Sequence, residues 1–222
     1  MSIGIREHAV LLAASYPARE YSAKADSQEI AAAVKALIGA VFQHGWSVVF
    51  GGHPTISPLI LMMAREYGRR NSITIYQSEY FRNHVGQATL ALLGEGYGRL
   101  EVIPNDASEP VPGPEEYPDA TKCPLSLSAM RSAMIGHPGL LGLLLIGGDS
   151  GLAEESALFR RSFPRLPIVP LGGPGGIAKE FAKDAATPGM DPELRTALSG
   201  SRNYLFLCAR IVHYLEAQRQ EA

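Results

Sequence analysis

LLLIGGDSGLAEE, residues 143–155, places an apolar run directly before a glycine pair and a helix-like run directly after it. VVFGGHPTIS, residues 48–57, repeats that order earlier in the chain. Glycine lets a backbone approach a ligand closely, and the exposed N–H groups of a first helical turn favour an anion. Two such turns in one domain predict a nucleotide-like ligand held between them.

The bulk composition indicates a folded α/β protein. The chain has 222 residues, of which 46% are hydrophobic and 19% are charged, so a sizeable core is expected and disorder is not. With 20 basic and 22 acidic residues the net charge is −2, which argues against nucleic acid as a partner, because that grip needs a basic excess.

The chain carries no sign of a metal site, a secretory leader or a membrane span. Cys123 and Cys208 are the two cysteines, and their spacing fits neither a zinc site nor a disulfide framework. The longest apolar stretch, 140–146, is far shorter than the roughly 20 residues of a membrane helix. We therefore expect a cytoplasmic protein with no metal and no cofactor. The absence of a P-loop and of a Gly-x-Ser-x-Gly elbow removes support for a P-loop ATPase and for a serine hydrolase.

Apolar runs that alternate with helical patterns set the expected fold. Strands are expected at residues 9–14, 47–50, 73–76, 100–103, 141–146 and 166–171, and helices at 27–41, 57–67, 87–93, 125–135, 152–159, 177–183 and 205–217. This alternation predicts an α/β fold with a doubly wound, mostly parallel, Rossmann-like sheet and ligands at the carboxyl ends of its strands.

The domain organisation is expected to be simple. Residues 1–222 are interpreted as a single domain, with an irregular, proline-rich insertion at about 104–124. A loop of that length is either a lid or interaction segment, or a variable insertion.

The candidate ligand contacts lie in these turns and at the strand ends. They are Ser15, Arg19, Gly51, Gly52, His53, Thr55, Gln77, Arg131, Gly147, Gly148, Asp149, Ser150, Gly151 and Glu154. In the earlier turn, a phosphate or ribose contact with Thr55 or Ser57 as helix N-cap competes with ordinary turn chemistry. In the later turn, Glu154 or Glu155 either accepts ribose hydroxyls, acts as an acid or base in glycosidic cleavage, or only stabilises the helix dipole.

Arg131 is the isolated cation of a helix built from small and apolar residues, Met130–Met134. It either pairs with a glutamate, binds a ligand phosphate, or lies on a solvated helix face. The glycine-rich exit at 172–176 either completes the wall of the ligand pocket or forms a tight turn.

These motifs together resemble the SLOG superfamily, which includes the LOG phosphoribohydrolases, DprA-like proteins and bacterial sensor domains of nucleotide-triggered defence systems. The resemblance rests on residues 51–57, on Met130–Met134, on 146–154 and on Ser15-Tyr16-Pro17, and it spans residues 8 to about 184 in order. For a LOG-like enzyme it implies Arg131 and Glu154 as the catalytic pair.

Three departures from the LOG pattern favour binding over catalysis. Ser132 stands where those enzymes have lysine, Ile146 where they have proline, and Ser150-Gly151 where they have Gly-Thr. The first hypothesis is accordingly a sensor of ADP-ribose, a cyclic ADP-ribose isomer or another NAD-derived signal in antiphage defence. The alternative is a nucleotide 5′-monophosphate N-glycosidase, and a DNA-handling role is disfavoured by the charge.

Partners are implied mainly by the resemblance, which suggests a homodimer and an effector protein. The apolar segment 204–212 is suited to a dimer interface, although core packing is the commoner use of such a stripe. No nucleic-acid partner and no membrane span are expected.

Overall fold

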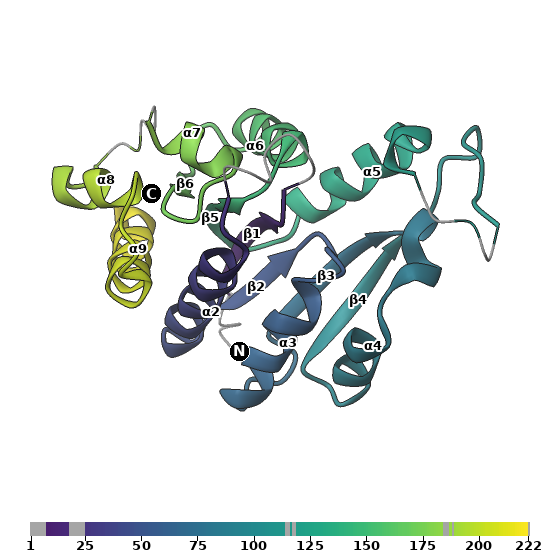
Figure 1. The fold of residues 1–222 in the computed structure, drawn as a ribbon, viewed down its shortest axis with the longest axis horizontal. Helices are drawn as coiled ribbons and strands as arrows, with labels where there is room; N and C mark the ends of the chain where they lie inside the picture. The colour runs from purple at the N-terminus through teal and green to yellow at the C-terminus, as the bar shows by residue number, and fades with distance from the viewer. Residues whose placement is uncertain are drawn as a thin grey trace, which may run out of the picture. The chain divides into compact units, whose positions relative to one another are not determined.

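The computed structural model describes residues 8–17, 25–113, 116, 119–183, 187 and 189–221. Figure 1 labels the helices and strands of the described residues. The chain divides into two compact units. The first unit contains residues 1–48 and 138–222, and the second contains residues 49–137. The expectation of one domain with an insertion at 104–124 stays a prediction.

The described residues form a parallel sheet with the strand order β4-β3-β2-β1-β5-β6. The strands are β1 (Ala9–Ser15), β2 (Ser47–Phe50), β3 (Ile73–Ser78), β4 (Gly98–Ile103), β5 (Leu140–Gly147) and β6 (Ile168–Leu171). The helices are α2 (Ser27–Gln43), α3 (Ser57–Glu66), α4 (Gln87–Gly94), α5 (Pro124–Ile135), α6 (Ser150–Ser162), α7 (Ile177–Lys183), α8 (Pro192–Leu198) and α9 (Tyr204–Glu221), with 3₁₀ helices η1 (Glu79–His84) and η2 (Ala120–Lys122). The predicted doubly wound α/β fold is confirmed.

The strand order reverses between β1 and β5, which are neighbours in the first unit although β2, β3 and β4 separate them in sequence. Their register pairs Leu11 with Leu143 and Ser15 with Gly147. All eight residues of β5 are buried, as expected for a strand covered on both faces. In open α/β sheets, ligands bind outside the carboxyl ends of the strands at such a reversal.

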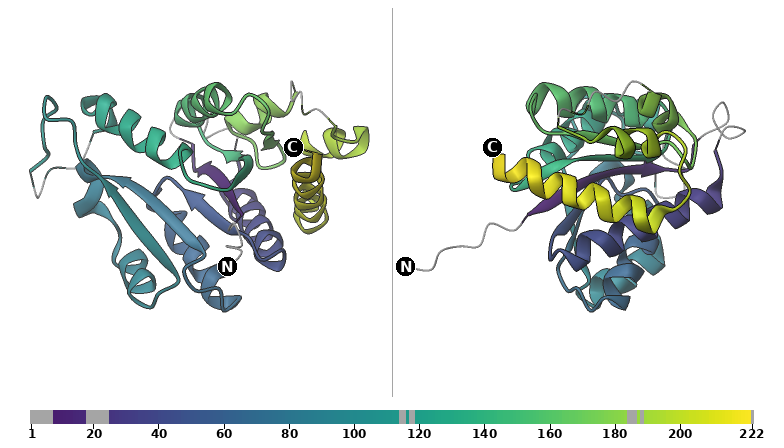
Figure 2. Two further views of the ribbon diagram at one scale, coloured as in Figure 1. Left: turned by 180° about the vertical axis from the view of Figure 1, so that it is seen from behind. Right: turned by 90° about the vertical axis from the view of Figure 1, so that its left-hand side faces the viewer.

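Helix α2 shows how local sequence sets an element of the first unit. Asp26 is its N-cap, with Oδ1 accepting the backbone N–H groups of Gln28 at 2.9 Å and of Glu29 at 3.2 Å. Ile30, where the apolar stripe of the helix begins, is fully buried. Helix α9 packs beside α2 in this unit (Figure 2). Contacts with α9, β5 and β1 therefore bury the apolar face of α2.

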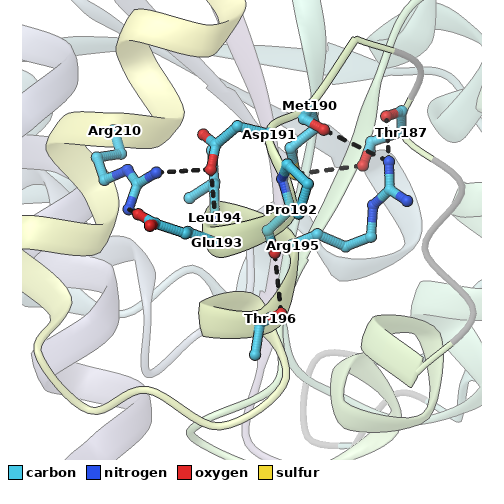
Figure 3. Close-up of polar contacts among 9 residues, drawn as sticks. All are labelled: Thr187, Met190, Asp191, Pro192, Glu193, Leu194, Arg195, Thr196 and Arg210. Atoms are coloured by element: carbon cyan, nitrogen blue, oxygen red, sulfur yellow. Dashed lines mark hydrogen bonds and ion pairs between the residues drawn. The ribbon is translucent and has the colours of Figure 1, made fainter.

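Helix α8, which the sequence did not predict, is tied down by charged side chains (Figure 3). Asp191 Oδ1 accepts the backbone N–H of Leu194 at 2.8 Å and Nη2 of Arg210, on α9, at 2.7 Å. These bonds hold the pKa of Asp191 below its ordinary value, the bond from Leu194 contributing most. Arg195 donates from the other side of the helix to the carbonyl of Thr187 at 3.4 Å. The short helix thus depends on side chains that are far apart in sequence.

The segment 104–124 is anchored to the start of α5 in the second unit. The carboxylate of Glu109 accepts the backbone N–H groups of Leu125 at 2.6 Å and Ser126 at 2.9 Å, and Asp106 N donates to Ser126 Oγ at 2.9 Å. Desolvation, the largest single contribution, acts to raise the pKa of Glu109. The hydrogen bonds from Ser126 and Leu125 together outweigh it and lower the pKa below its ordinary value. A proline-rich stretch without strands among its described residues therefore supplies the cap of a helix.

One helix boundary corrects the sequence-based expectation. Helix α6 begins at Ser150, two residues before the predicted start at Leu152. Asp149 is the N-cap, so Ser150 and Gly151 are the first residues of the helix instead of the end of a loop. The 3₁₀ helix η1 was also not predicted, because one-turn helices carry no apolar periodicity.

Candidate functional site

In the earlier glycine turn, in the second unit, backbone N–H groups are hydrogen-bonded within the turn itself. The carbonyl of His53 accepts the N–H groups of Ile56 at 3.1 Å and Ser57 at 2.9 Å, and Ser57 Oγ at 2.8 Å. Thr55 N donates to His53 Nδ1 at 3.3 Å. The next residue of α3, Pro58, has no N–H. The expected row of exposed amides for an anion is therefore largely occupied at this helix.

The N-cap of α3 is also different from the expected one. The capping residue is Ile56, and no side chain caps the helix, so the prediction of Thr55 or Ser57 as N-cap is wrong. The hydroxyl of Ser57 instead closes the turn onto the carbonyl of His53. Because Thr55 N can only donate, Nδ1 of His53 accepts, and a neutral His53 carries its proton on Nε2.

A cavity of about 380 Å³ lies within the second unit, where the turn after β2 meets the end of β3. Its volume falls in the range typical of small-molecule sites. It is lined by Gly51, Gly52, His53, Pro54, Ser57, Ile75, Gln77, Phe81, His84, Val85, Gly86, Thr89, Leu127 and Met130. No carboxylate, ammonium or guanidinium belongs to this described lining, so the cavity suits an uncharged group.

The sequence reasoning had selected only part of this lining. Gly51, Gly52, His53 and Gln77 were predicted and are brought together, whereas Thr55 is exposed and does not line the cavity. Other lining residues come from η1, α4 and α5, which the sequence did not assign to a site. The signal that could have found η1 is the Ser78-Glu79 pair, since Ser78 Oγ accepts the N–H of Tyr80 as a helix cap.

Gln77 is the most buried of the predicted contacts in the cavity. It lies near the carboxyl end of β3, and 8% of its surface is exposed. Its side-chain amide lies over Gly52, whose φ is +59°. A Cβ at position 52 would overlap Gln77 Oε1 and would lie 3.1 Å from Gln77 Cδ. Only glycine fits at this position without moving the amide.

Arg131 is half-buried on α5, directly after the cavity residue Met130. Its charge acts on the nearby thiol of Cys123 in the direction that lowers the pKa, but burial dominates and raises the pKa of Cys123 to about 11. Burial also raises the pKa of Cys208 to about 12. Both thiols are therefore protonated at neutral pH, and the thiol is a much weaker nucleophile than the thiolate.

The later glycine turn, in the first unit, likewise bonds to itself and to its neighbours. Gly148 N donates to the carbonyl of Ser15 at 2.9 Å. Asp149 receives the N–H of Gly151 on Oδ1 at 3.2 Å and the N–H of Leu152 on its carbonyl at 3.1 Å. A carboxylate of the chain itself thus occupies part of the N-terminus of α6, where an anion was expected.

A second glycine-rich turn of the first unit, 172–176, packs directly on this one. A Cβ on Gly176 would lie 2.7 Å from the carbonyl oxygen of Gly147 and 2.9 Å from its Cα. Ile177 N donates to the carbonyl of Gly148 at 3.0 Å. Backbone packed against backbone leaves no space for a side chain at Gly176, whereas a Cβ on Gly147 would meet Ile30 and the carbonyl oxygen of Ser15, each at 2.7 Å.

The acidic residues after the later turn lie on α6. Glu154 is exposed and Glu155 is half-buried. Within the described ranges, no group of three or more His, Cys, Asp or Glu side chains is arranged to hold a metal ion. Arg19, another predicted contact, lies outside the described residues. Across the part of the chain that the structure describes, no helix combines the length and apolar character needed to cross a membrane.

Comparison with known proteins identifies the family. Residues 20–94 and 119–207 match the model of the SLOG cluster3 family. A comparison with curated proteins gives no match. Among solved structures, the X-ray structure of TM1055, a structural-genomics target, is similar with a TM-score of 0.52 and 16% identity, covering 85% of this chain and 88% of that one. That likeness shows the shared fold. The chain is a nucleotide-related, Rossmann-like domain, and it belongs to the SLOG cluster3 family.

Proposed function

We propose that this domain binds a nucleotide-derived small molecule and acts as its sensor, with ADP-ribose, a cyclic ADP-ribose isomer or another NAD-derived signal as the ligand class. The observation that carries the proposal is the cavity of about 380 Å³ at the carboxyl ends of β2 and β3. Its apolar walls and few polar groups suit the neutral heterocycle of a nucleotide. Family membership supplies the nucleotide context.

Arg131 is our proposed anchor for phosphate. It follows Met130 on the helix that lines the cavity, and a guanidinium forms paired hydrogen bonds with phosphate oxygens. The residues of the later turn in the first unit, Ser15 and 147–151 with Glu154, remain proposed contacts for ribose or phosphate. A homodimer, an effector partner, a cytoplasmic location and a defence role belong to the same proposal.

Calorimetry on the full chain tests this function. ADP-ribose and AMP are expected to bind, and AMP is expected to bind more tightly than adenosine because only AMP carries a phosphate. In Arg131→Ala that preference should fall about tenfold or more. Arg65→Ala is the matched control, because Arg65 is an exposed arginine of α3 that does not line the cavity. Absence of heat with ADP-ribose, AMP and NAD would overturn the proposal.

The same samples separate sensing from hydrolysis. Chromatography of AMP incubated with concentrated protein is expected to show intact AMP after hours. Release of adenine that is lost in both Arg131→Ala and Glu154→Gln would instead favour the N-glycosidase. Circular dichroism melting of each variant is the control for folding, because a variant that melts like the unmodified chain has lost binding without unfolding.

A further inference from the structure

Gln77 presents an unusual combination of burial and unused hydrogen-bonding groups. Only 8% of the surface of the residue is exposed, and Gln77 belongs to the lining of the cavity. Neither end of its amide is hydrogen-bonded to another residue that the structure describes. The amide atoms are not sealed from solvent, and a polar group that lines a cavity in this way commonly meets a ligand or water. Gln77 therefore has one acceptor and two donor positions directed at no protein partner.

The glycine beside it explains how the amide is held. The φ of Gly52 is +59°, and the space that a Cβ would fill there is taken by Gln77 Oε1. The backbone carbonyl of Tyr76 lies 3.1 Å from the same point. Glycine at position 52 thus makes room for the amide. This role differs from the phosphate contact that the glycine pair suggested.

The remaining walls select the kind of group that meets Gln77. Phe81, Leu127 and Met130 are apolar, and no Asp, Glu, Lys or Arg side chain belongs to the lining among the residues that the structure describes. A planar, uncharged group with a polar edge fits such surroundings. A carboxamide pairs with an edge that offers a donor and an acceptor side by side, as the exocyclic amino group and the ring nitrogen of adenine do.

We infer that Gln77 recognises the amino edge of a 6-aminopurine base in this cavity, and that Gly52 is required to place its amide. The inference rests on the proposed function, since it names the part of the nucleotide that the cavity takes. Gln77 is then the residue that determines specificity for the base, while the phosphate is held elsewhere.

The test compares two nucleotides that differ only at the purine edge. AMP and purine riboside 5′-monophosphate carry the same phosphate, but the second lacks the 6-amino group. The unmodified chain is expected to bind AMP about three- to tenfold more tightly, the effect of one hydrogen bond. Gln77→Leu is expected to bind both nucleotides equally. Gln87→Leu makes the same chemical change on the exposed start of α4 and should keep the preference.

Thermal melting without ligand gives a second readout. If Gln77 has no partner in the protein, Gln77→Leu melts at the same temperature as the unmodified chain or higher. A markedly lower melting temperature would assign Gln77 a structural bond and overturn the inference. Gln77→Glu keeps an oxygen that accepts from the 6-amino group but cannot donate to a ring nitrogen, so it should keep the preference for AMP while binding both nucleotides more weakly.

The failures of the two proposals are distinguishable. Nucleotides that bind with a preference for AMP that persists in Gln77→Leu overturn the role of Gln77 and leave the proposed function standing. Equal binding of the two nucleotides to the unmodified chain has the same consequence. No binding of any nucleotide overturns both.

Discussion

The two glycine pairs look alike in sequence and differ in what fills the space above them. Phe50-Gly51-Gly52-His53 in the second unit leads to a cavity, and the side chain over Gly52 is the polar end of Gln77. In the first unit, Ile146-Gly147-Gly148-Asp149 meets another backbone turn at Gly176. A glycine pair after a strand shows that a side chain must be absent. It does not show whether a ligand, a side chain or a second loop takes the room.

Topology and cavity volume point to different turns. The later turn follows β5, where the strand order reverses beside β1, which is the general location of ligands in open α/β sheets. The earlier turn follows β2 and has the cavity of about 380 Å³. Substitutions in each unit separate a turn that binds from a turn that packs.

The largest effect is expected from Gly176→Ala in the first unit. The added Cβ would meet the backbone of Gly147 at 2.5 to 2.9 Å, and φ at Gly176 is +67°. Backbone atoms cannot give way cheaply, so we expect a loss of about 3 kcal/mol or more in the free energy of unfolding. Denaturant unfolding measures it. Gly200→Ala is the control, with no atom within 4 Å of its added Cβ, and should change stability by less than about 0.5 kcal/mol. A small effect of Gly176→Ala would contradict the close packing of the 172–176 turn on the backbone of Gly147.

Gly52→Ala in the second unit is expected to lower ligand affinity strongly and stability less than Gly176→Ala does. Its Cβ would displace the flexible end of Gln77, so the stability loss should be about 1–2 kcal/mol, mainly from φ at +59°. AMP affinity should fall roughly tenfold, because the displaced amide no longer meets the base. Calorimetry and unfolding are run together, with Gly94→Ala as the control because its Cβ would meet no atom within 4 Å. A stability loss as large as that of Gly176→Ala, with unchanged affinity, would make the two turns equivalent.

The smallest effect is expected at Asp149, the cap of α6. Asp149→Asn keeps a side-chain oxygen for Gly151 N but removes a negative charge from the helix N-terminus. Because the later turn is a proposed contact for phosphate, we expect Asp149→Asn to bind AMP severalfold more tightly than the unmodified chain. Asp149→Ala, which loses the cap, should lower stability by about 1 kcal/mol. AMP affinity that is identical in Asp149→Asn and the unmodified chain would give the later turn a structural role alone.

Part of the site was readable from sequence because it depends on local pattern. The run from Leu143 to Ile146 is apolar on both faces, which predicts a buried parallel strand, and strand β5 confirms it. Gly52 and Gln77 were selected since they follow strands that end at the same edge of the sheet, and both line the cavity. Phe81 and Leu127 gave no comparable signal, because apolar residues of η1 and α5 look like ordinary core.

Helix capping was the feature of the structure that the sequence predicted least well. Thr55 or Ser57 was expected to cap α3, yet the hydroxyl of Ser57 donates to the carbonyl of His53. Glu109 caps α5 from 16 positions away, a distance over which no local pattern operates. Hydrogen bonds of this kind follow from how the chain folds back, and no spacing along the sequence encodes them.

The sequence alone determined the α/β class, the parallel strands and the places where the backbone needs glycine, because periodicity and conformational preference act over a few neighbouring residues. Tertiary structure decided what each glycine accommodates. Gly52 faces the amide of Gln77, and Gly176 faces the backbone of Gly147, through contacts between segments brought together only by folding. Since excluded volume depends on which atoms arrive from elsewhere in the chain, two similar glycine pairs took up different tasks.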